Sequence, residues 1–152
     1  ELAARRHGAH LRVDTVETAV LRSGWEGELG PVGYTVAYDV AADQLRLGLD
    51  VVADAVHPVA SSREAWRQVA RDTPAHLVEV ELGCGDDVEH RSRVETREPD
   101  LAGRRLPDWP DVLERYYEPW DDPGVLHLDT AAEDPAALAA RIDAAAPDRQ
   151  GR

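Results

Sequence analysis

LRVD at residues 11–14 and DVVAD at residues 50–54 are short apolar segments that each end on an aspartate. Each is typical of a buried strand that delivers a carboxylate to the edge of a parallel sheet. In open α/β sheets, ligands bind at the carboxyl ends of the strands. The two acids therefore predict a candidate active-site edge in an α/β domain that handles nucleotides.

The rest of the chain alternates apolar segments with helical patterns. Strands are expected at 10–14, 49–54, 77–82 and 125–129, and helices at 15–22, 31–47, 61–72, 86–97 and 109–117 and from 135 onward, with residues 1–9 as the end of an earlier helix. Strands that alternate with helices predict one parallel sheet, covered on both faces and built with right-handed crossovers.

Local signals mark the expected helix ends and faces. Ser61 and Glu64 match a capping box, and Asp108 and Asp134 are expected to cap the helices that follow them. In the helix at 31–47, the expected apolar face is Tyr34, Tyr38, Ala41 and Leu45, which recur at helical spacing.

Composition narrows the class of protein. The 152 residues, 43% of them hydrophobic, are expected to form a single domain over 1–152. A net charge of −13 disfavours nucleic acid and anionic membranes as partners, and no apolar run approaches the ~18 residues of a membrane span. The lone Cys84 fits a reducing cytoplasm. The 17 basic residues are all arginine, a bias that suggests a GC-rich bacterial genome, and the absence of methionine suggests a processed chain or a fragment.

The two strand-ending acids each have two interpretations. Asp14 is either a general base that accepts a proton from a substrate hydroxyl or the N-cap of the next helix, and both roles can coexist. Asp54 is either a ligand of Mg²⁺, held directly or through water, or a turn residue that bonds its own backbone.

Histidine and arginine side chains are the next candidates. His57, beside Pro58, is either a structural histidine or a contact for phosphate or substrate. Arg91, Arg93 and Arg97 form a basic patch on one predicted helix, followed by Arg104 and Arg105 in the next loop; guanidinium groups of this kind match phosphate oxygens. The alternative is a solvated helix face with ion pairs of Arg93 to Glu89 and of Arg91 to Glu95.

Together these segments resemble the small P-loop kinases, a family of AAA-type ATPases and predicted kinases related to chloramphenicol phosphotransferase, zeta toxin and polynucleotide-kinase-like enzymes. The segments that carry the resemblance are LRVDTVETAVLRSG (11–24), GPVGYTVAYDVAADQLRLGLDVVADAVHP (30–58), SREAWRQVA (62–70), HRSRVETREPDLAGRRLPDWPDVLERYYEPW (90–120) and HLDTA (127–131). The resemblance implies a P-loop NTPase fold, a three-layer α/β/α arrangement around a parallel sheet. It also implies a lid region at 90–120, with ATP and Mg²⁺ as cofactors.

The resemblance also implies roles for single residues. Asp14 corresponds to the general base toward the acceptor hydroxyl, and Asp54 to an acid near Mg²⁺. Residues implied at the nucleotide are Arg91, Arg93 and Arg97 on the lid helix, with Arg91 and Arg97 assigned to catalysis, and Thr130 beside the adenine. Residues implied near the small-molecule acceptor are Tyr34, Tyr38, Asp43 and His57.

One departure from the family bears on activity. The family's first strand and its G-x-x-x-x-G-K-[ST] loop are absent, and the sequence contains no lysine. The expectation is a fragment of an ATP-dependent phosphotransferase, itself inactive or nearly so. The alternatives are a family member that has lost ATP binding, a non-catalytic ligand-binding or toxin–antitoxin interaction domain, and a nucleotide hydrolase without an acceptor.

Overall fold

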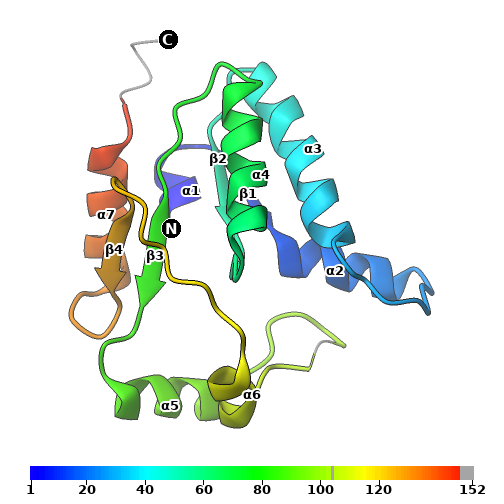
Figure 1. Ribbon diagram of the computed structural model, residues 1–152, viewed down its shortest axis with the longest axis vertical. Coiled ribbons are helices and arrows are strands. Elements are labelled where there is room, and N and C mark those ends of the chain that lie inside the picture. The colour runs from blue at the N-terminus through cyan, green and yellow to red at the C-terminus, as the bar shows by residue number, and fades with distance from the viewer. Residues whose placement is uncertain (104, 148–152) are drawn as a thin grey trace. The chain divides into compact units, whose positions relative to one another are not determined.

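The computed structural model describes residues 1–103 and 105–147 (Figure 1). Along the chain the elements are α1 (Leu2–Arg5), β1 (Ala9–Arg12), α2 (Val13–Arg22), α3 (Val32–Arg46), β2 (Val51–Asp54), α4 (Ala60–Arg71), β3 (Val80–Gly83), α5 (Asp87–Thr96), α6 (Trp109–Glu114), β4 (Leu126–Asp129) and α7 (Pro135–Ala145). This is the order of strands and helices expected from the sequence, so the mixed α/β class is confirmed.

The strands pair in parallel, but in two separate sheets. β1 pairs with β2, with Ala9 opposite Val51 and Arg12 opposite Asp54. β3 pairs with β4, with Val80 opposite Leu126. The expected parallel pairing is confirmed, whereas the described strands form two two-stranded sheets in place of one. The three-layer P-loop arrangement stays a prediction.

The chain divides into two compact units, each built around one of these sheets. The β1–β2 unit contains Ala3–Ala75 and Pro99–Arg105. The β3–β4 unit contains Glu1–Leu2, His76–Glu98 and the chain from Leu106 onward. Of the expected lid region at 90–120, residues 99–105 therefore belong to the first unit and the rest to the second. The single domain over 1–152 and the lid stay predictions.

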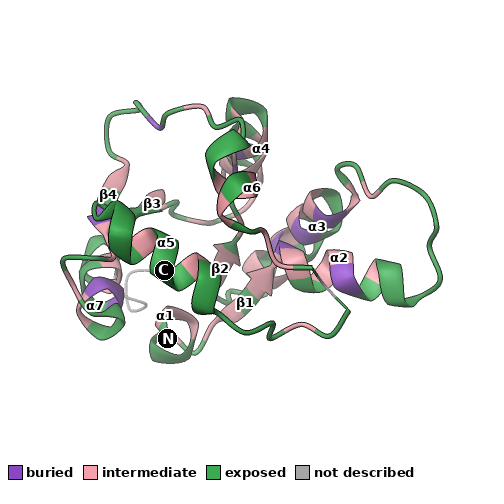
Figure 2. Cartoon of the chain, turned by 90° about the horizontal axis from the view of Figure 1, so that it is seen from below, coloured by how far each residue is buried: buried purple, intermediate pink, exposed green. Residues whose placement is uncertain are grey.

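The core of the β1–β2 unit is formed by the small residues of α3. Gly33, Ala37 and Ala41 are buried at four-residue spacing. Figure 2 shows buried segments on α3, and α3 lies against α2, α4 and both strands. A Cβ added at Gly33 would lie 2.5 Å from Cγ of Glu17, so glycine permits this close approach to α2. The face expected from Tyr34 to Leu45 shares only Ala41 with the buried one, because small side chains let α3 approach its neighbours.

Two expected helix starts are wrong. β1 ends at Arg12, and Asp14 lies in the first turn of α2 rather than at a strand end or at the N-cap, which is Arg12. Val13, the first residue of α2, is among the most buried side chains, and its burial accompanies this earlier helix start. Likewise α4 begins at Ala60 after the extended Val59, so Ser61 is a helical residue and not the N-cap.

The core of the β3–β4 unit contains Leu128 of β4, Leu138 and Ala139 of α7, and Trp120. The expected caps of its last two helices are confirmed. Asp108 and Asp111 form a capping box at α6, and Asp134 accepts hydrogen bonds from two backbone N–H groups of α7. Within the described residues, no helix has the length and apolar character needed to cross a membrane.

Candidate functional site

The carboxyl ends of β1 and β2 gather charged side chains. Asp54 is the last residue of β2, and its carboxylate lies 3.0 Å from Nε2 of His10 on β1. Arg12, opposite Asp54 in the sheet, places Nη2 3.8 Å from Oδ2 of Asp14. The strand pairing therefore brings the two predicted acids to one sheet edge. The positive charge of Arg12 interacts there with both carboxylates.

Arg12 has a further partner from far along the chain. Its Nη1 donates to Oδ2 of Asp100, and its Nη2 donates to Oδ1 at 3.3 Å. The hydrogen bond to Asp100, together with the charges of Asp100, Asp14 and Asp54, raises the pKa of Arg12 above its ordinary value despite partial burial. The guanidinium therefore stays charged and partly neutralises this acidic edge.

The acids fit Mg²⁺ only as a partial ligand set. Magnesium is usually held by one or two carboxylates together with water and the phosphates of a substrate. Asp54 supplies an oxygen ligand of the correct type, and its alternative interpretation as a turn residue gives way to its contact with His10. Among the described residues, no group of three or more His, Cys, Asp or Glu side chains is arranged to hold a metal ion. The Mg²⁺ role of Asp54 stays a prediction.

Four rings pack together beside this edge. Tyr34 and Tyr38 of α3 contact each other, with centroids 6.3 Å apart, and Tyr34 meets His57 at 5.7 Å. Trp66 of α4 packs edge-on against Tyr38 at 4.7 Å and against His57 at 6.1 Å. The structure thus brings together three of the four residues predicted at the acceptor pocket.

His57 is the most buried residue of this ring cluster. It is 8% exposed and has a left-handed backbone with φ of 49°, and Nη1 of buried Arg63 donates to its carbonyl oxygen at 3.2 Å. Burial lowers the pKa of His57 to about 4, helped by Arg63 and opposed by Asp54. Burial also raises the pKa of Tyr38 to about 12. Such packing favours the structural interpretation of His57.

Asp43, the fourth predicted acceptor residue, lies elsewhere. It is near the C-terminal end of α3, where it pairs with Arg46 at 3.2 Å. Nine residues of helix separate it from Tyr34, which corresponds to about 13 Å along the axis. The structure therefore does not bring Asp43 to the ring cluster.

The predicted lid arginines all bond to groups of the chain itself. Arg91 donates to Glu95 and Arg93 to Glu89, each at 2.8 Å, as the helix-face interpretation predicts. Nη2 of Arg97 donates to the carbonyl oxygen of Pro107 at 3.2 Å. The i,i+4 pairs expected for a solvated helix face are confirmed.

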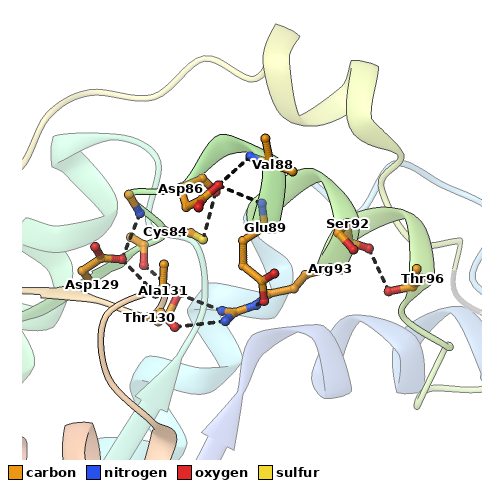
Figure 3. A network of polar contacts seen from close by, with 12 residues as sticks. Cys84, Asp86, Val88, Glu89, Ser92, Arg93, Thr96, Asp129, Thr130 and Ala131 are labelled. Atoms are coloured by element: carbon orange, nitrogen blue, oxygen red, sulfur yellow. Dashed lines mark hydrogen bonds and ion pairs between the residues drawn. The ribbon is translucent and has the colours of Figure 1, made fainter.

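Arg93 also reaches the residue predicted beside the adenine (Figure 3). Its Nη1 donates to Oγ1 of Thr130 at 3.2 Å, and its Nη2 donates to the carbonyl oxygen of Thr130 at 3.1 Å. Thr130 in turn donates to the carbonyl oxygen of Gly83 at 2.8 Å. Arg93 and Thr130 therefore tie α5 to the ends of β3 and β4.

Asp129 closes the adjoining loop. Its Oδ1 accepts the backbone N–H groups of Gly85 and Ala131, each at 2.9 Å, and these bonds lower the pKa of Asp129 (Figure 3). A Cβ at Gly85 would lie 2.6 Å from Oδ2, so glycine admits the carboxylate. Within the β3–β4 unit, this end of the sheet is a satisfied hydrogen-bond network.

Several residues of the site are not predicted by the sequence patterns. Trp66 and Arg63 lie within the helix expected at 61–72, where an aromatic and an arginine side chain three positions apart on one face are a usable signal. His10, Arg12 and Asp100 carry no local signal, because their partners are 44 and 88 positions away in the sequence.

The burial of His57 leads to a pH prediction. In the unfolded chain this histidine binds a proton near pH 6.5, but in the folded chain only near pH 4. Between these values the unfolded state binds more protons, so stability is lost as pH falls from about 6.5 to about 4 and then levels off. The loss expected from this group is about 3 kcal/mol.

Urea unfolding across this pH range measures the effect. The variant His57→Gln should show a flatter pH dependence than the wild type, while His76→Gln, at an exposed position, should retain the wild-type slope. Parallel pH profiles for wild type and His57→Gln would contradict the prediction. Carboxylates that titrate in the same pH range are present in both proteins, so their contribution drops out of the difference between the two pH profiles.

Comparison with known proteins identifies a similar fold but no family. No family model matches the chain, and no curated protein matches it significantly. The structure is similar to a crystal structure from Chloroflexus aurantiacus that is described as "a putative kinase", with a TM-score of 0.62 and 18% sequence identity. The match covers 94% of this chain and 84% of the other. At this identity the likeness shows a kinase-like fold.

Proposed function

We propose that this chain is a kinase-like phosphotransferase domain, in the class that transfers the γ-phosphate of ATP to a small-molecule hydroxyl. The observation that carries the proposal is the position of the two acids at the carboxyl ends of two paired parallel strands: Asp54 is the last residue of β2, and Asp14 lies in the first turn of α2, directly after β1. The description of the Chloroflexus aurantiacus protein as a kinase supports the same class.

Each side chain at this edge has a role in the proposed reaction. Asp14 accepts the proton of the acceptor hydroxyl, which makes that oxygen a better nucleophile toward phosphorus. Asp54 is the residue that would hold Mg²⁺, an ion that neutralises charge on transferring phosphates. Tyr34 and Tyr38, on the ring cluster beside the edge, supply an apolar wall for the acceptor, while the hydroxyl of Tyr38 donates to the carbonyl oxygen of Ser62 at 3.0 Å.

Two features of this chain disfavour tight binding of the nucleotide. Arg91, Arg93 and Arg97 would have to exchange their bonds to Glu95, Glu89 and Pro107 for phosphate oxygens. The sequence also has no lysine and no G-x-x-x-x-G-K-[ST] loop to surround the phosphates. The 152 residues are therefore expected to bind ATP weakly and to transfer phosphate slowly.

A second candidate function is non-catalytic: a ligand-binding or toxin–antitoxin interaction domain with the same fold. The observation that favours it is the engagement of Arg93, whose Nε, Nη1 and Nη2 all donate to Glu89 or Thr130. A guanidinium held this way stabilises the fold, and its N–H groups are already used within the chain instead of being open to a phosphate.

Two measurements on the full chain test the proposal. Titration with a fluorescent ATP analogue is expected to show no saturation in the micromolar range. At millimolar Mg-ATP, γ-labelled phosphate should pass to at least one member of a panel of small hydroxyl compounds. The variant Asp14→Asn should lose this transfer but keep basal hydrolysis.

The variant Asp39→Asn is the matched control, because this exposed acid lies on α3 and has no proposed role. It should transfer phosphate at the wild-type rate. Micromolar nucleotide affinity would contradict the weak binding, and equal transfer by Asp14→Asn would contradict the role of the base. Transfer to none of the acceptors would favour the non-catalytic domain.

A further inference from the structure

Residues 99–103, which we call the strap, reach the charged edge of the β1–β2 unit. The strap clusters with that unit, although Glu98 before it and Leu106 after it belong to the β3–β4 unit. Asp100 is the strap residue that contacts the sheet, through two hydrogen bonds from Arg12. The chain thus places a carboxylate at the end of β1 from 88 positions away.

The contact has the geometry in which arginine binds ligand anions. Nη1 and Nη2 of Arg12 point to the two different oxygens of the Asp100 carboxylate, which is a bidentate fork. Guanidinium groups hold carboxylate and phosphate ligands through the same pair of parallel bonds. The carboxylate of Asp100 therefore has the shape and charge of a ligand group at Arg12.

Burial differs between the two partners in a way that permits exchange. The side chain of Arg12 is 28% exposed, whereas that of Asp100 is 61% exposed. The guanidinium is thus fixed at the sheet edge, and the carboxylate that covers it faces solvent. Exposed ion pairs contribute little to stability, so an external anion at sufficient concentration competes with this one.

Charge balance is compatible with such an exchange. Arg12 lies near three carboxylates, those of Asp100, Asp14 and Asp54, which together exceed its single positive charge. An added anion would be repelled, but a singly charged anion that replaces the carboxylate of Asp100 at Arg12 leaves the charge around the guanidinium unchanged. The displaced strap then carries its own negative charge away from the edge.

We propose that Arg12 is an anion-binding residue of the acceptor site, and that Asp100 occupies it until a carboxylate or phosphate group of the ligand displaces the strap. This inference rests on the proposed function, which puts the acceptor at the end of β1. Since Nη2 of Arg12 is 3.8 Å from Asp14, a bound anion would lie close to the proposed base. The acceptor class is therefore a small alcohol that also carries a carboxylate or a phosphate.

Anion titrations of the full chain test this inference without measuring phosphoryl transfer. Inorganic phosphate and, separately, acetate are added while two sets of NMR signals are followed: the Nε–H of Arg12 where arginine is present, and the backbone amides of residues 11–13 in every variant. Removing the internal competitor with Asp100→Asn should tighten binding of the preferred anion about 2- to 5-fold, the range that matches a weak exposed ion pair. The arm with the larger response identifies phosphate or carboxylate as the ligand group.

Hydrogen exchange at the amides of residues 100–103 gives a second readout. Exchange should be faster in Asp100→Asn than in wild type, and wild type should approach the variant when the preferred anion saturates it. An anion that binds without changing strap exchange would overturn the displacement.

Three further variants make the result specific. Arg12→Gln should abolish the anion response, and Arg12→Lys, which keeps the charge but not the fork, should weaken it while circular dichroism confirms the fold. Glu64→Gln removes an exposed ion pair of 2.5 Å to Arg71 on α4, where Arg71 keeps its hydrogen bonds to Gln68, and serves as the control. In this variant Arg71 should gain no measurable affinity for the added anion. Unchanged binding in Asp100→Asn, retained binding in Arg12→Gln, or an equal gain at Arg71 would each overturn the inference. A chain that binds anions at Arg12 yet transfers no phosphate would contradict only the proposed function.

Discussion

Replacing Arg6 with alanine is expected to destabilise the fold by about 3–5 kcal/mol, the usual cost of leaving one charge of a buried ion pair without its partner. Nε of Arg6 donates to Oδ2 of Asp50 at 2.9 Å, and the two side chains are only 13% and 7% exposed. Asp50 directly precedes β2, and its carbonyl oxygen accepts the N–H of Ala9 at 2.8 Å. The pair therefore secures the point where β1 and β2 begin to run side by side.

Urea unfolding followed by circular dichroism measures this loss. Arg46→Ala is the matched control, since it breaks the ion pair to Asp43 in the same unit, where both side chains are largely exposed. That change should cost less than about 1 kcal/mol. If both variants lost the same small amount of stability, the buried pair would contribute no more than a surface one.

The neighbouring Gly8 explains why the place where β1 and β2 begin is sensitive to substitution. A Cβ at Gly8 would lie 2.6 Å from the backbone oxygen of Asp50, a contact that no side-chain movement relieves. The backbone before β1 therefore packs directly on the residue before β2. A cation at a different position in the chain therefore cannot easily take the place of Arg6 beside Asp50.

The second large effect is expected in the other unit. Leu128→Ala should destabilise it by about 2–5 kcal/mol, because truncation of a buried leucine loses apolar burial and leaves a cavity. Leu128 lies on β4 with 4% of its surface exposed. Its cost depends on how far the surrounding side chains move in to fill the space.

Leu82 provides a control of the same residue type in the same sheet. It lies directly opposite Leu128 in the β3–β4 register but is 59% exposed. Leu82→Ala should therefore cost well under half as much in a urea titration. Equal losses for the two variants would contradict the prediction that burial of the side chain sets the cost.

Local patterns predicted the elements because their causes are local. Asp108 and Asp134 were identified as caps from neighbouring residues, and the structure shows both accepting backbone N–H groups within three positions. The ion pairs of Arg91 and Arg93 were identified from helical spacing, since residues four apart share a helix face. Such interactions need no knowledge of the rest of the fold.

Packing changed the details that local patterns favoured. Burial of Val13 accompanies a start of α2 before Asp14, and close approach of α2 selects Gly33 rather than the expected aromatic residues for the inner face of α3. Tyr34 and Tyr38 instead meet His57 and Trp66. Periodicity detects a repeating face but not which neighbour covers it.

The amino-acid sequence by itself determined the order of strands and helices, the parallel class of the pairing, and the presence of two acids near the carboxyl ends of β1 and β2. These follow from periodicity, caps and charge, which act over a few residues. Only the tertiary structure decided that the strands form two pairs, that Asp54 meets His10, and that Arg12 is held by Asp100. Contacts between residues 44 or 88 positions apart depend on how whole elements pack. The local sequence around either partner therefore does not reveal the contact.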